Sequence, residues 1–353
     1  MKKEIIERIL SWNKGIKQGP IKFDIFLTNK CNLNCKFCAY PRLNNIKEEL
    51  NKEKILDLLK EAKELNAKIF GILGGEPFVR KDTIEIMRRA KQYDMDGSLV
   101  TNGTLLSEED LKSITEMHWD LIRFSVDGSK KEIHDFLRGK EDSFSKTTTA
   151  IKKLQEIKGE TETNSPTIEI NTVLCKKNIL DLPNIITLSN ELKIKRIYLL
   201  PMIEFVEDIE DLKIKDIQTT LKVIDQSKNL AADYNITVNL DEIKENYIFT
   251  KPNEMDEVKL SKNNSTPCFL PWYSICINAY GDVTPCAVLA EEKEAFCGNI
   301  NEETLDKIWY GNKFSKIREN MAKQKMLSAC SRCCMPLHEE NNKIREEIKE
   351  WKS

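Results

Sequence analysis

The sequence of 353 residues predicts an α/β protein: a partial (β/α)6 barrel of the TIM-like type, followed by a small cysteine-rich C-terminal domain. Two observations predict this fold. Short apolar runs alternate with helical patterns about six times, which is typical of parallel strands joined by right-handed helical crossovers. Polar residues of functional type directly follow these runs, and the loops after the strands of such a barrel form one mouth. Six units rather than eight indicate a barrel that stays open on one side.

The strands are expected where short apolar runs end in glycine, proline or polar residues. They are residues 23–27, 68–73, 97–100, 121–126, 167–174 and 196–200, with a further short strand at 236–240. The helices are expected where apolar residues recur at helical spacing, as Ile55, Leu58, Leu59 and Ala62 do. They are residues 1–10, 52–66, 81–93, 107–117, 144–158, 182–192 and 214–234. Ser107 and Asp110 form a pattern like a capping box at the start of one helix.

The chain is expected to divide into five segments. They are an N-terminal helix at 1–17, the barrel at 18–240, a polar and poorly periodic linker at 241–266, a C-terminal domain that binds a cluster at 267–338, and a helical tail at 339–353. The net charge is −2 although 32% of the residues are charged, so no broad basic field offers itself to nucleic acid or to lipid.

Targeting signals are not apparent in the sequence. No run approaches the length of about 18 apolar residues that a membrane span requires, and the first ten residues predict a charged amphipathic helix rather than a signal peptide. We therefore expect a cytoplasmic protein. Eleven cysteines without a secretion signal indicate metal binding in a reducing compartment rather than disulfides.

Three cysteines lie close together after the first strand. Cys31, Cys35 and Cys38 have the spacing C-x3-C-x2-C. Thiolates are soft ligands, and a [4Fe–4S] cluster normally takes four of them, so this run suits such a cluster with one iron left open to a ligand that is not protein. Structural zinc would need a fourth ligand nearby, and the first histidine is His118.

This run resembles the cluster motif of the radical S-adenosylmethionine (SAM) superfamily, and Phe37 and Tyr40 also fit that motif. The resemblance implies that the amino and carboxylate groups of SAM chelate the open iron. Four later segments resemble those of the family in the same order. They are 69–77 with Gly74, Gly75 and Glu76; 101–103 with Thr101 and Asn102; 124–128 with Ser125 and Asp127; and 133–139 with Arg138. The resemblance implies that the first holds the SAM amino group and that the last two line its ribose and carboxylate.

The side chains of these segments suit such tasks. Gly74 and Gly75 let a backbone turn approach a ligand closely. Glu76 can accept hydrogen bonds from an ammonium group, and Arg138 can hold a carboxylate in a bidentate fork. Ser125 ends a strand, where its hydroxyl can reach a cofactor. His134, in the same segment as Arg138, is expected to make a structural hydrogen bond.

The C-terminal region carries a second set of cysteines. Cys268-x12-Gly281-x4-Cys286 frames a hairpin-like stretch at 274–284, and Cys330-x2-Cys333 closes the region. Two such pairs can converge on one tetrathiolate site, which zinc and an iron–sulfur cluster would both accept. The region resembles the SPASM domain and its shorter "twitch" relative, which implies an auxiliary [4Fe–4S] cluster.

The number of auxiliary clusters follows from the remaining cysteines. Fuller SPASM domains continue with further cysteines after the Cys-x2-Cys pair, whereas residues 335–353 contain none. The resemblance therefore implies one auxiliary cluster, with Cys268, Cys286, Cys330 and Cys333 as ligands and Cys334 able to replace Cys333. Cys276 alternates with isoleucines and is expected to be a buried strand thiol. Cys297 precedes a turn, and the sequence does not distinguish between packing in the core and ligation of a cluster for its side chain.

Cys175 follows the strand at 167–174 and is therefore expected near the barrel mouth. A thiol there can donate a hydrogen atom to a substrate radical, as in radical epimerases of the superfamily. The alternative is a small apolar residue at a strand end.

The resemblance also implies a reaction. A reductase such as flavodoxin or ferredoxin would reduce the first cluster, SAM would be cleaved to a 5′-deoxyadenosyl radical, and the radical would abstract a hydrogen atom from the substrate. Only about 20 residues precede the first strand, so an N-terminal peptide-recognition domain is not expected. We therefore expect oxidation of a small molecule, such as a sugar or cyclitol, with the auxiliary cluster as electron acceptor. The alternatives are modification or epimerisation of a peptide or protein, and a role as an electron carrier or scaffold without catalysis.

Overall fold

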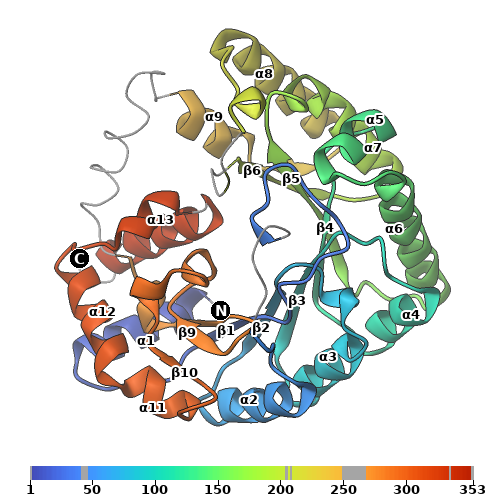
Figure 1. Ribbon diagram of the computed structural model, residues 1–353. Coiled ribbons are helices and arrows are strands. Elements are labelled where there is room, and N and C mark those ends of the chain that lie inside the picture. Colours follow the sequence, from blue (N-terminus) through green and yellow to red (C-terminus); the bar gives the residue numbers. More distant parts are fainter. Residues whose placement is uncertain are drawn as a thin grey trace.

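A computed structural model of the chain describes residues 2–40, 47–202, 206, 209–248, 268–333 and 335–350. Figure 1 shows a curved sheet at the centre, helices around its outer side, and the C-terminal region (orange to red) beside the first strand. The strands are β1 (Lys22–Phe26), β2 (Ile69–Leu73), β3 (Asp96–Thr101), β4 (Leu121–Ser125), β5 (Thr167–Leu174), β6 (Arg196–Pro201), β7 (Thr237–Val238), β8 (Ser274–Ile277), β9 (Asp282–Thr284) and β10 (Gly298–Asn299).

The helices of the barrel cover the outer side of the sheet. The α-helices are α1 (Lys2–Asn13), α2 (Lys52–Glu64), α3 (Thr83–Gln92), α4 (Glu108–Glu116), α5 (Lys131–Arg138), α6 (Ser143–Glu160), α7 (Leu182–Glu191), α8 (Ile217–Asp233), α9 (Leu240–Ile248), α11 (Leu305–Tyr310), α12 (Asn312–Ala322) and α13 (Met335–Glu350). None of the helices in these described ranges is both long enough and apolar enough to cross a bilayer.

The sheet has the topology of an open barrel. Its strand order is β10-β9-β8-β1-β2-β3-β4-β5-β6-β7, and β1 to β7 are parallel neighbours in chain order. The first strand therefore pairs with β8 instead of closing onto the last barrel strand. This arrangement confirms the predicted partial barrel and brings the carboxyl ends of β1 to β6 to one mouth.

Successive side chains along each strand point alternately outward, into the core between sheet and helices, and inward, into the barrel interior. Phe23, Phe70, Leu99 and Ile122 are fully buried and belong to the same apolar cluster as the inner faces of the helices. The intervening residues face the interior, because successive side chains of a strand point to opposite faces. At the end of the barrel away from the mouth, Glu169 pairs with Arg123 and Arg196 at 2.8 and 2.9 Å.

The structure places the predicted strands and helices within a few residues of their expected bounds, and it confirms the capping box of α4. Helices α5, α9 and α12 were not among the predicted ones, and α13 begins at Met335, ahead of the predicted start of the helical tail at residue 339. The short helix α5 was not expected, because its N-cap residue Lys130 gives no side-chain cap. Helix α9 occupies the start of the predicted linker, because Leu240 and Ile243 are buried in the main core. The rest of that linker lies outside the described residues.

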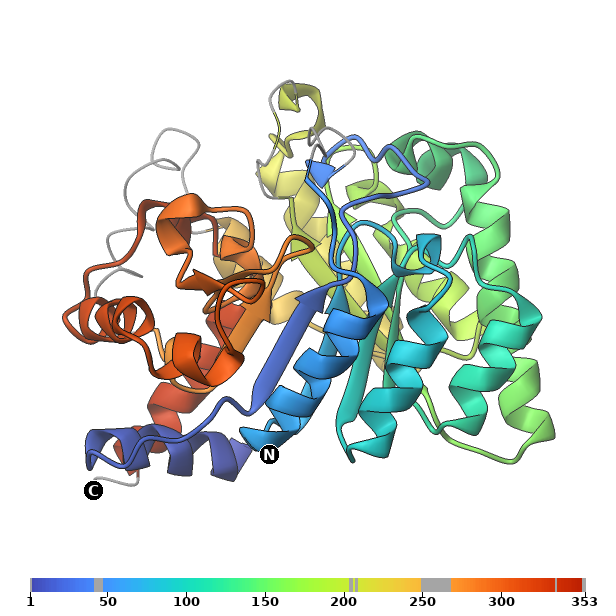
Figure 2. The same cartoon turned by 60° about the horizontal axis from the view of Figure 1, so that its bottom comes forward.

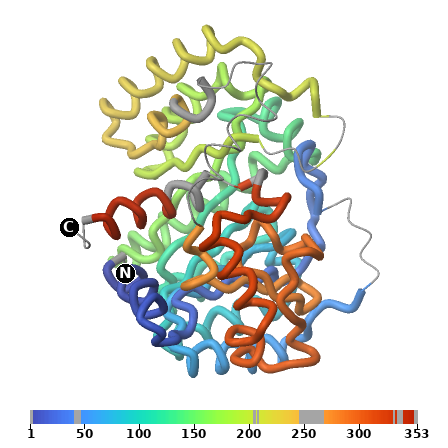
Figure 3. The backbone as a smooth tube through the Cα atoms, turned by 90° about the vertical axis from the view of Figure 1, so that its left-hand side faces the viewer, coloured from blue at the N-terminus to red at the C-terminus, as the bar shows by residue number. Residues whose placement is uncertain are grey.

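The C-terminal region is continuous with the barrel sheet. Strand β8 pairs with β1 in parallel, from Lys22 opposite Ser274 to Ile25 opposite Ile277. Strand β9 then returns antiparallel to β8, which confirms the predicted hairpin. Helix α13 packs against α1, as Figure 3 shows for the red and dark blue helices. The two regions therefore share one sheet and one set of packed helices.

Candidate functional site

The start of the loop that carries the first three cysteines is fixed by hydrogen bonds to a half-buried carboxylate. Glu49 accepts hydrogen bonds from the Thr28 hydroxyl at 2.9 Å and from the Asn29 amide at 2.8 Å. The turn after β2 adds two backbone bonds, from Gly75 to the Thr28 carbonyl at 2.7 Å and from Glu76 to the Lys30 carbonyl at 2.9 Å. Sequence patterns gave no signal for Glu49, because its partners lie about 20 residues away in the chain.

The three thiols of this loop gather in one apolar cluster. Cys31, Cys35 and Cys38 pack with Leu33 and Phe37 at the mouth of the barrel. Burial, against the opposing Leu33 amide and with a smaller contribution from the nearby Cys35, Glu76 and Cys38, raises the pKa of the Cys31 thiol to about 11. The Leu33 amide donates to the Cys31 sulfur at 3.4 Å. Buried thiols with a raised pKa stay protonated at neutral pH, so a bound metal must displace their protons.

Arg138 is already paired within the protein. Its Nη2 lies 2.6 Å from Asp127 Oδ2, and its Nη1 lies 3.8 Å from the Cys35 sulfur. Asp127 is fully buried and also accepts from the Val173 amide at 2.8 Å. Both ends of the guanidinium fork thus face protein groups, and the buried Nε has no hydrogen-bond partner among the described residues. The role of Arg138 toward a ligand carboxylate stays a prediction.

The two glycines of the turn after β2 also meet protein rather than open space. A Cβ atom on Gly74 would lie 2.4 Å from the Thr28 carbonyl oxygen, and one on Gly75 would lie 2.2 Å from that of Lys30. Gly74 has a φ of +130°. The close approach of the cysteine loop is therefore one physical reason for glycine at both positions, and their expected contact with a ligand stays a prediction.

Glu76 joins this turn to the end of β3. Its carboxylate accepts from the Thr101 hydroxyl at 2.8 Å, the Asn102 amide at 2.7 Å and the Phe78 amide at 3.2 Å. Burial raises the pKa of the Glu76 carboxyl, although these donors lower it. Asn102 also donates to the Asn32 side chain at 2.9 Å, which ties β3 to the cysteine loop.

The remaining candidate cofactor residues lie at the same mouth. Tyr40 packs on Phe26 with ring centroids 5.6 Å apart. Ser125 ends β4 and lies opposite Asn171 of β5 in the sheet register. Sequence analysis missed Asn171, whose Oδ1 is buried without a hydrogen-bond partner in the described part of the chain. Asn171 directly follows the core residue Ile170 and so lies on the opposite face of β5, toward the barrel interior; this alternation is the signal that could have found it.

Cys175 lies beside the cysteine loop and is fully buried in the same apolar cluster. Its amide donates to Asn178 Oδ1 at 2.8 Å. Burial raises the pKa of its thiol to about 11. The structure thus confirms its expected place near the barrel mouth, while its role stays a prediction.

The four cysteines expected to hold the auxiliary cluster come together in the C-terminal region. Burial raises the pKa of the Cys286 thiol well above its usual range, and the charges of Cys268, Cys333 and Cys330 raise it further. Asn341 of α13 donates to the Cys268 sulfur at 3.6 Å. The predicted helical tail therefore lies against this set of four cysteines.

The other cysteines of the region lie apart from these four. Cys276 is fully buried on β8 beside Phe26 and Tyr40, as expected for a strand thiol. Cys297 belongs to the main core, and its thiol lies 3.5 Å from the Ala295 carbonyl oxygen, which favours packing over ligation. Cys334 lies outside the described residues.

Both sets of cysteines offer the type of ligand atom that iron–sulfur clusters bind. Sulfur ligands near amide and guanidinium donors are the usual setting of iron–sulfur clusters. In the described ranges, no three His, Cys, Asp or Glu side chains converge tightly enough for a single metal ion. The thiolates of a [4Fe–4S] cluster bind different irons, so they need not converge on one point.

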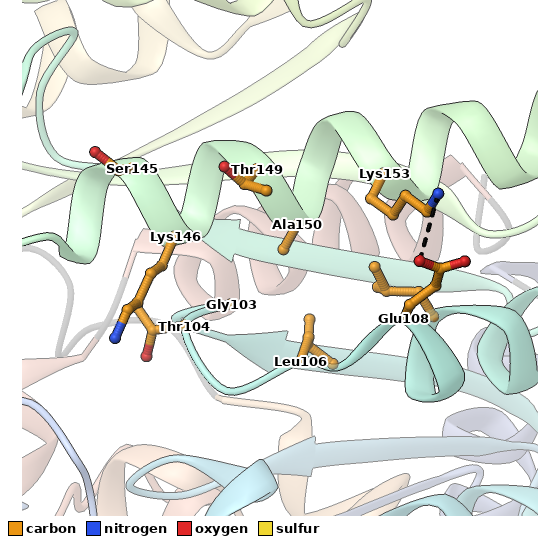
Figure 4. A pocket seen from close by; sticks show the side chains of 10 residues that line it. Gly103, Thr104, Leu106, Glu108, Ser145, Lys146, Thr149, Ala150 and Lys153 are labelled. Atoms are coloured by element: carbon orange, nitrogen blue, oxygen red, sulfur yellow. Dashed lines mark ion pairs between the residues drawn. The ribbon is translucent and has the colours of Figure 1, made fainter.

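The structure also contains a pocket of about 490 Å³ that is lined by no cysteine. Figure 4 shows it between α6 and the segment from the end of β3 to α4, with an ion pair at one end. That pair joins Lys153 and Glu108 at 3.5 Å. None of the cysteines lines this pocket, so it is not part of the candidate site.

Two family models match the chain. Residues 25–182 match the model described as the radical SAM superfamily, and residues 268–334 match SPASM, described as an iron–sulfur cluster-binding domain. A PqqA peptide cyclase from Rhizobium meliloti is 24% identical over 313 residues, which cover 87% of this chain and 78% of that protein. An AdoMet-dependent heme synthase from Methanosarcina barkeri is 30% identical over 167 residues, which cover 47% of this chain and 46% of that protein. The match thus spans less than half the length of that second relative.

Two solved structures share the fold. SuiB from Streptococcus suis has a TM-score of 0.67 at 17% identity, covering 93% of this chain and 75% of that chain. A structure of anSMEcpe with bound AdoMet and a Cp18Cys peptide has a TM-score of 0.64 at 20% identity, covering 89% of this chain and 86% of that chain. Both similarities extend over the barrel and the C-terminal region.

Proposed function

Because the chain is a radical SAM protein with a C-terminal SPASM domain, we propose that it modifies a peptide by hydrogen abstraction. The observation that carries this proposal is the match to a peptide cyclase along 87% of the chain, through both domains. The heme synthase match covers only 47% of the chain. This proposal replaces the expected small-molecule oxidation as our first choice, since that expectation rested on the short segment before the first strand.

We assign the following residues to the clusters and to SAM. Cys31, Cys35 and Cys38 would hold the first cluster, and Cys268, Cys286, Cys330 and Cys333 one auxiliary cluster. The residues proposed to contact SAM are Tyr40, Gly74, Gly75, Glu76, Thr101, Asn102, Ser125, Asp127 and Arg138. When bound, the reduced cluster and SAM supply a 5′-deoxyadenosyl radical that removes a hydrogen atom from the substrate.

The protein's part is to exclude water and to hold these groups still. Leu33, Phe37 and Leu137 pack around the thiols of the cysteine loop and keep solvent from them. Glu76 cross-links the turn after β2 to β3, so the expected ligand-binding edges move as one unit. The open side between β7 and the C-terminal region supports access for a substrate as large as a peptide.

Cys175 remains our proposed hydrogen donor for the case in which the reaction ends as an epimerisation. Its burial beside the cysteine loop supports a place close to the radical. An oxidation would need no such donor, because the substrate would then lose an electron instead of gaining a hydrogen atom.

The experiment is an anaerobic assay of 5′-deoxyadenosine with dithionite, SAM and host-cell extract, either intact or digested with protease. We expect the extract to stimulate the reaction and digestion to abolish the stimulation. Cys35→Ala is the inactive control, and Cys297→Ala, outside both thiol groups, should behave as the wild type.

Stimulation that survives digestion would overturn the peptide proposal in favour of a small-molecule substrate. A protein with both clusters intact that never forms 5′-deoxyadenosine would instead support the electron-carrier alternative.

A further inference from the structure

A phenylalanine ring on the outer side of the cysteine loop is exposed between two lysines. Phe136 of α5 keeps 45% of its surface exposed. Lys36 Nζ lies 5.5 Å from the ring centroid, and Lys177 Nζ lies 5.1 Å from it. The three residues come from the cysteine loop, α5 and the segment after β5. A large apolar ring left exposed between cations from separate elements is a feature of binding surfaces.

Two further exposed lysines lie close in the chain to these residues. Lys140 follows α5 and donates to the Asn32 carbonyl at 3.3 Å, and Lys176 is exposed beside Lys177. Lys140, Lys176 and Lys177 form no ion pair in the described part of the chain, whereas Lys131 of α5 pairs with Asp142 at 2.6 Å. Glu132, one helical turn before Phe136, is the acidic residue on the same helix face. The surface is therefore basic on balance.

This surface is joined directly to the thiols beneath it. The Lys36 amide donates to the Leu137 carbonyl at 2.9 Å, and the Asn34 amide donates to that of Arg138 at 3.2 Å. Lys36 follows Cys35 in the chain, and Arg138 Nη1 lies 3.8 Å from the Cys35 sulfur. Figure 2 shows the blue cysteine loop at the same end of the barrel as the green segment with α5. Short covalent and hydrogen-bonded routes thus lead from the exposed ring to a cluster ligand.

We propose that Lys36, Phe136, Lys140, Lys176 and Lys177, here called the Lys–Phe surface, dock an acidic flavodoxin-type electron carrier. The carrier would give up one electron and the first cluster would gain it, with no bond formed or broken. This inference rests on the proposed function, which requires a one-electron donor. Opposite charge steers such a partner, and the flat Phe136 ring offers an apolar platform to the ring of a flavin.

The test compares a charge-reversed surface with a matched control. The variant is Lys36→Glu with Lys177→Glu, and the control is Lys60→Glu with Lys112→Glu, which makes the same charge change at exposed lysines on α2 and α4. Each protein is driven either by reduced flavodoxin or by dithionite, and 5′-deoxyadenosine is measured at several salt concentrations.

We expect the second-order rate with flavodoxin to fall at least about tenfold in the variant, with a flatter salt dependence, and to hold in the control. Glu132→Lys should raise that rate. The dithionite-driven rate and the iron content should match the wild type in all three proteins.

Equal flavodoxin rates in variant and control would overturn the docking surface. So would a wild type that responds to dithionite and to ferredoxin but not to flavodoxin. If no protein, including the wild type, formed 5′-deoxyadenosine with dithionite, the proposed function itself would be contradicted. The two negative results are therefore distinguishable.

Discussion

His134 is a single buried residue on which the cysteine-bearing end of the barrel depends. Its ring is 1% exposed, its Nδ1 accepts from the Asp127 amide at 3.2 Å, and it lies edge-on to Phe144 at 5.7 Å. This bond confirms the predicted structural role. Burial, together with the smaller effect of the Arg138 charge, lowers the pKa of His134 from 6.5 to about 3.

The depressed pKa of His134 predicts a loss of stability in mild acid. Below about pH 6.5 the unfolded chain binds a proton at this residue and the folded chain does not, so stability falls as the pH drops toward the folded value. Between about pH 7 and pH 5 the loss should be about 2 kcal/mol. Urea unfolding at both pH values checks this expectation. His134→Gln should reduce the dependence, and His118→Gln, at an exposed histidine, should retain it; equal slopes in both variants would contradict the assignment.

At the scale of elements, the end of α5 is where a helix terminus and the cysteine loop meet. Gly139 ends the helix in the left-handed conformation, with a φ of +65°. A Cβ atom there would lie 2.0 Å from the Asn34 carbonyl oxygen. Any side chain would therefore be strained in its own backbone and would also push the loop away from the helix.

Gly139→Ala should lower both stability and the iron content of the first cluster. We expect a cost of about 2 kcal/mol or more, because the substitution combines a left-handed φ with a backbone contact that cannot give way. The control is Gly159→Ala on α6, where a Cβ atom would meet nothing within 4 Å. It should instead gain about 0.5–1 kcal/mol. Thermal unfolding and iron analysis check both variants, and full iron occupancy in Gly139→Ala would refute the packing argument.

At the scale of the whole molecule, one sheet connects the two sets of cysteines, which lie on either side of β1. The cysteine loop follows β1 directly, while Cys268 and Cys286 flank the hairpin that pairs with it through β8. The auxiliary group draws its sulfurs from residues 268–333 and its wall from Asn341 of α13, with no residue of the cysteine loop. The two groups should therefore bind iron independently.

Replacement of Cys31, Cys35 and Cys38 by alanine together should leave about four irons per chain. The reciprocal variant Cys286→Ala should lose the auxiliary iron and keep the first cluster. Metal analysis with absorption spectra distinguishes these results. Zinc without iron in the triple variant would refute the auxiliary cluster.

Local patterns alone predicted much of this protein. Periodicity located the strands and most helices, because each barrel unit buries a regular apolar face, and the cysteine spacing identified both thiol groups. The capping box of α4 needed only two residues close in the chain. The short helix α5 has no side-chain N-cap, so no capping pattern in the sequence indicated its start.

What only the tertiary structure decided depends on contacts between distant segments. The pairing of β8 with β1 joins the two domains, and Arg138 pairs with Asp127, a residue 11 positions earlier in the chain. Gly74 and Gly75 let the cysteine loop approach closely, and Glu49 holds that loop from a position that no motif marks. A sequence pattern shows which side chains are able to bind a group; packing in three dimensions decides which of them the protein has already used for itself.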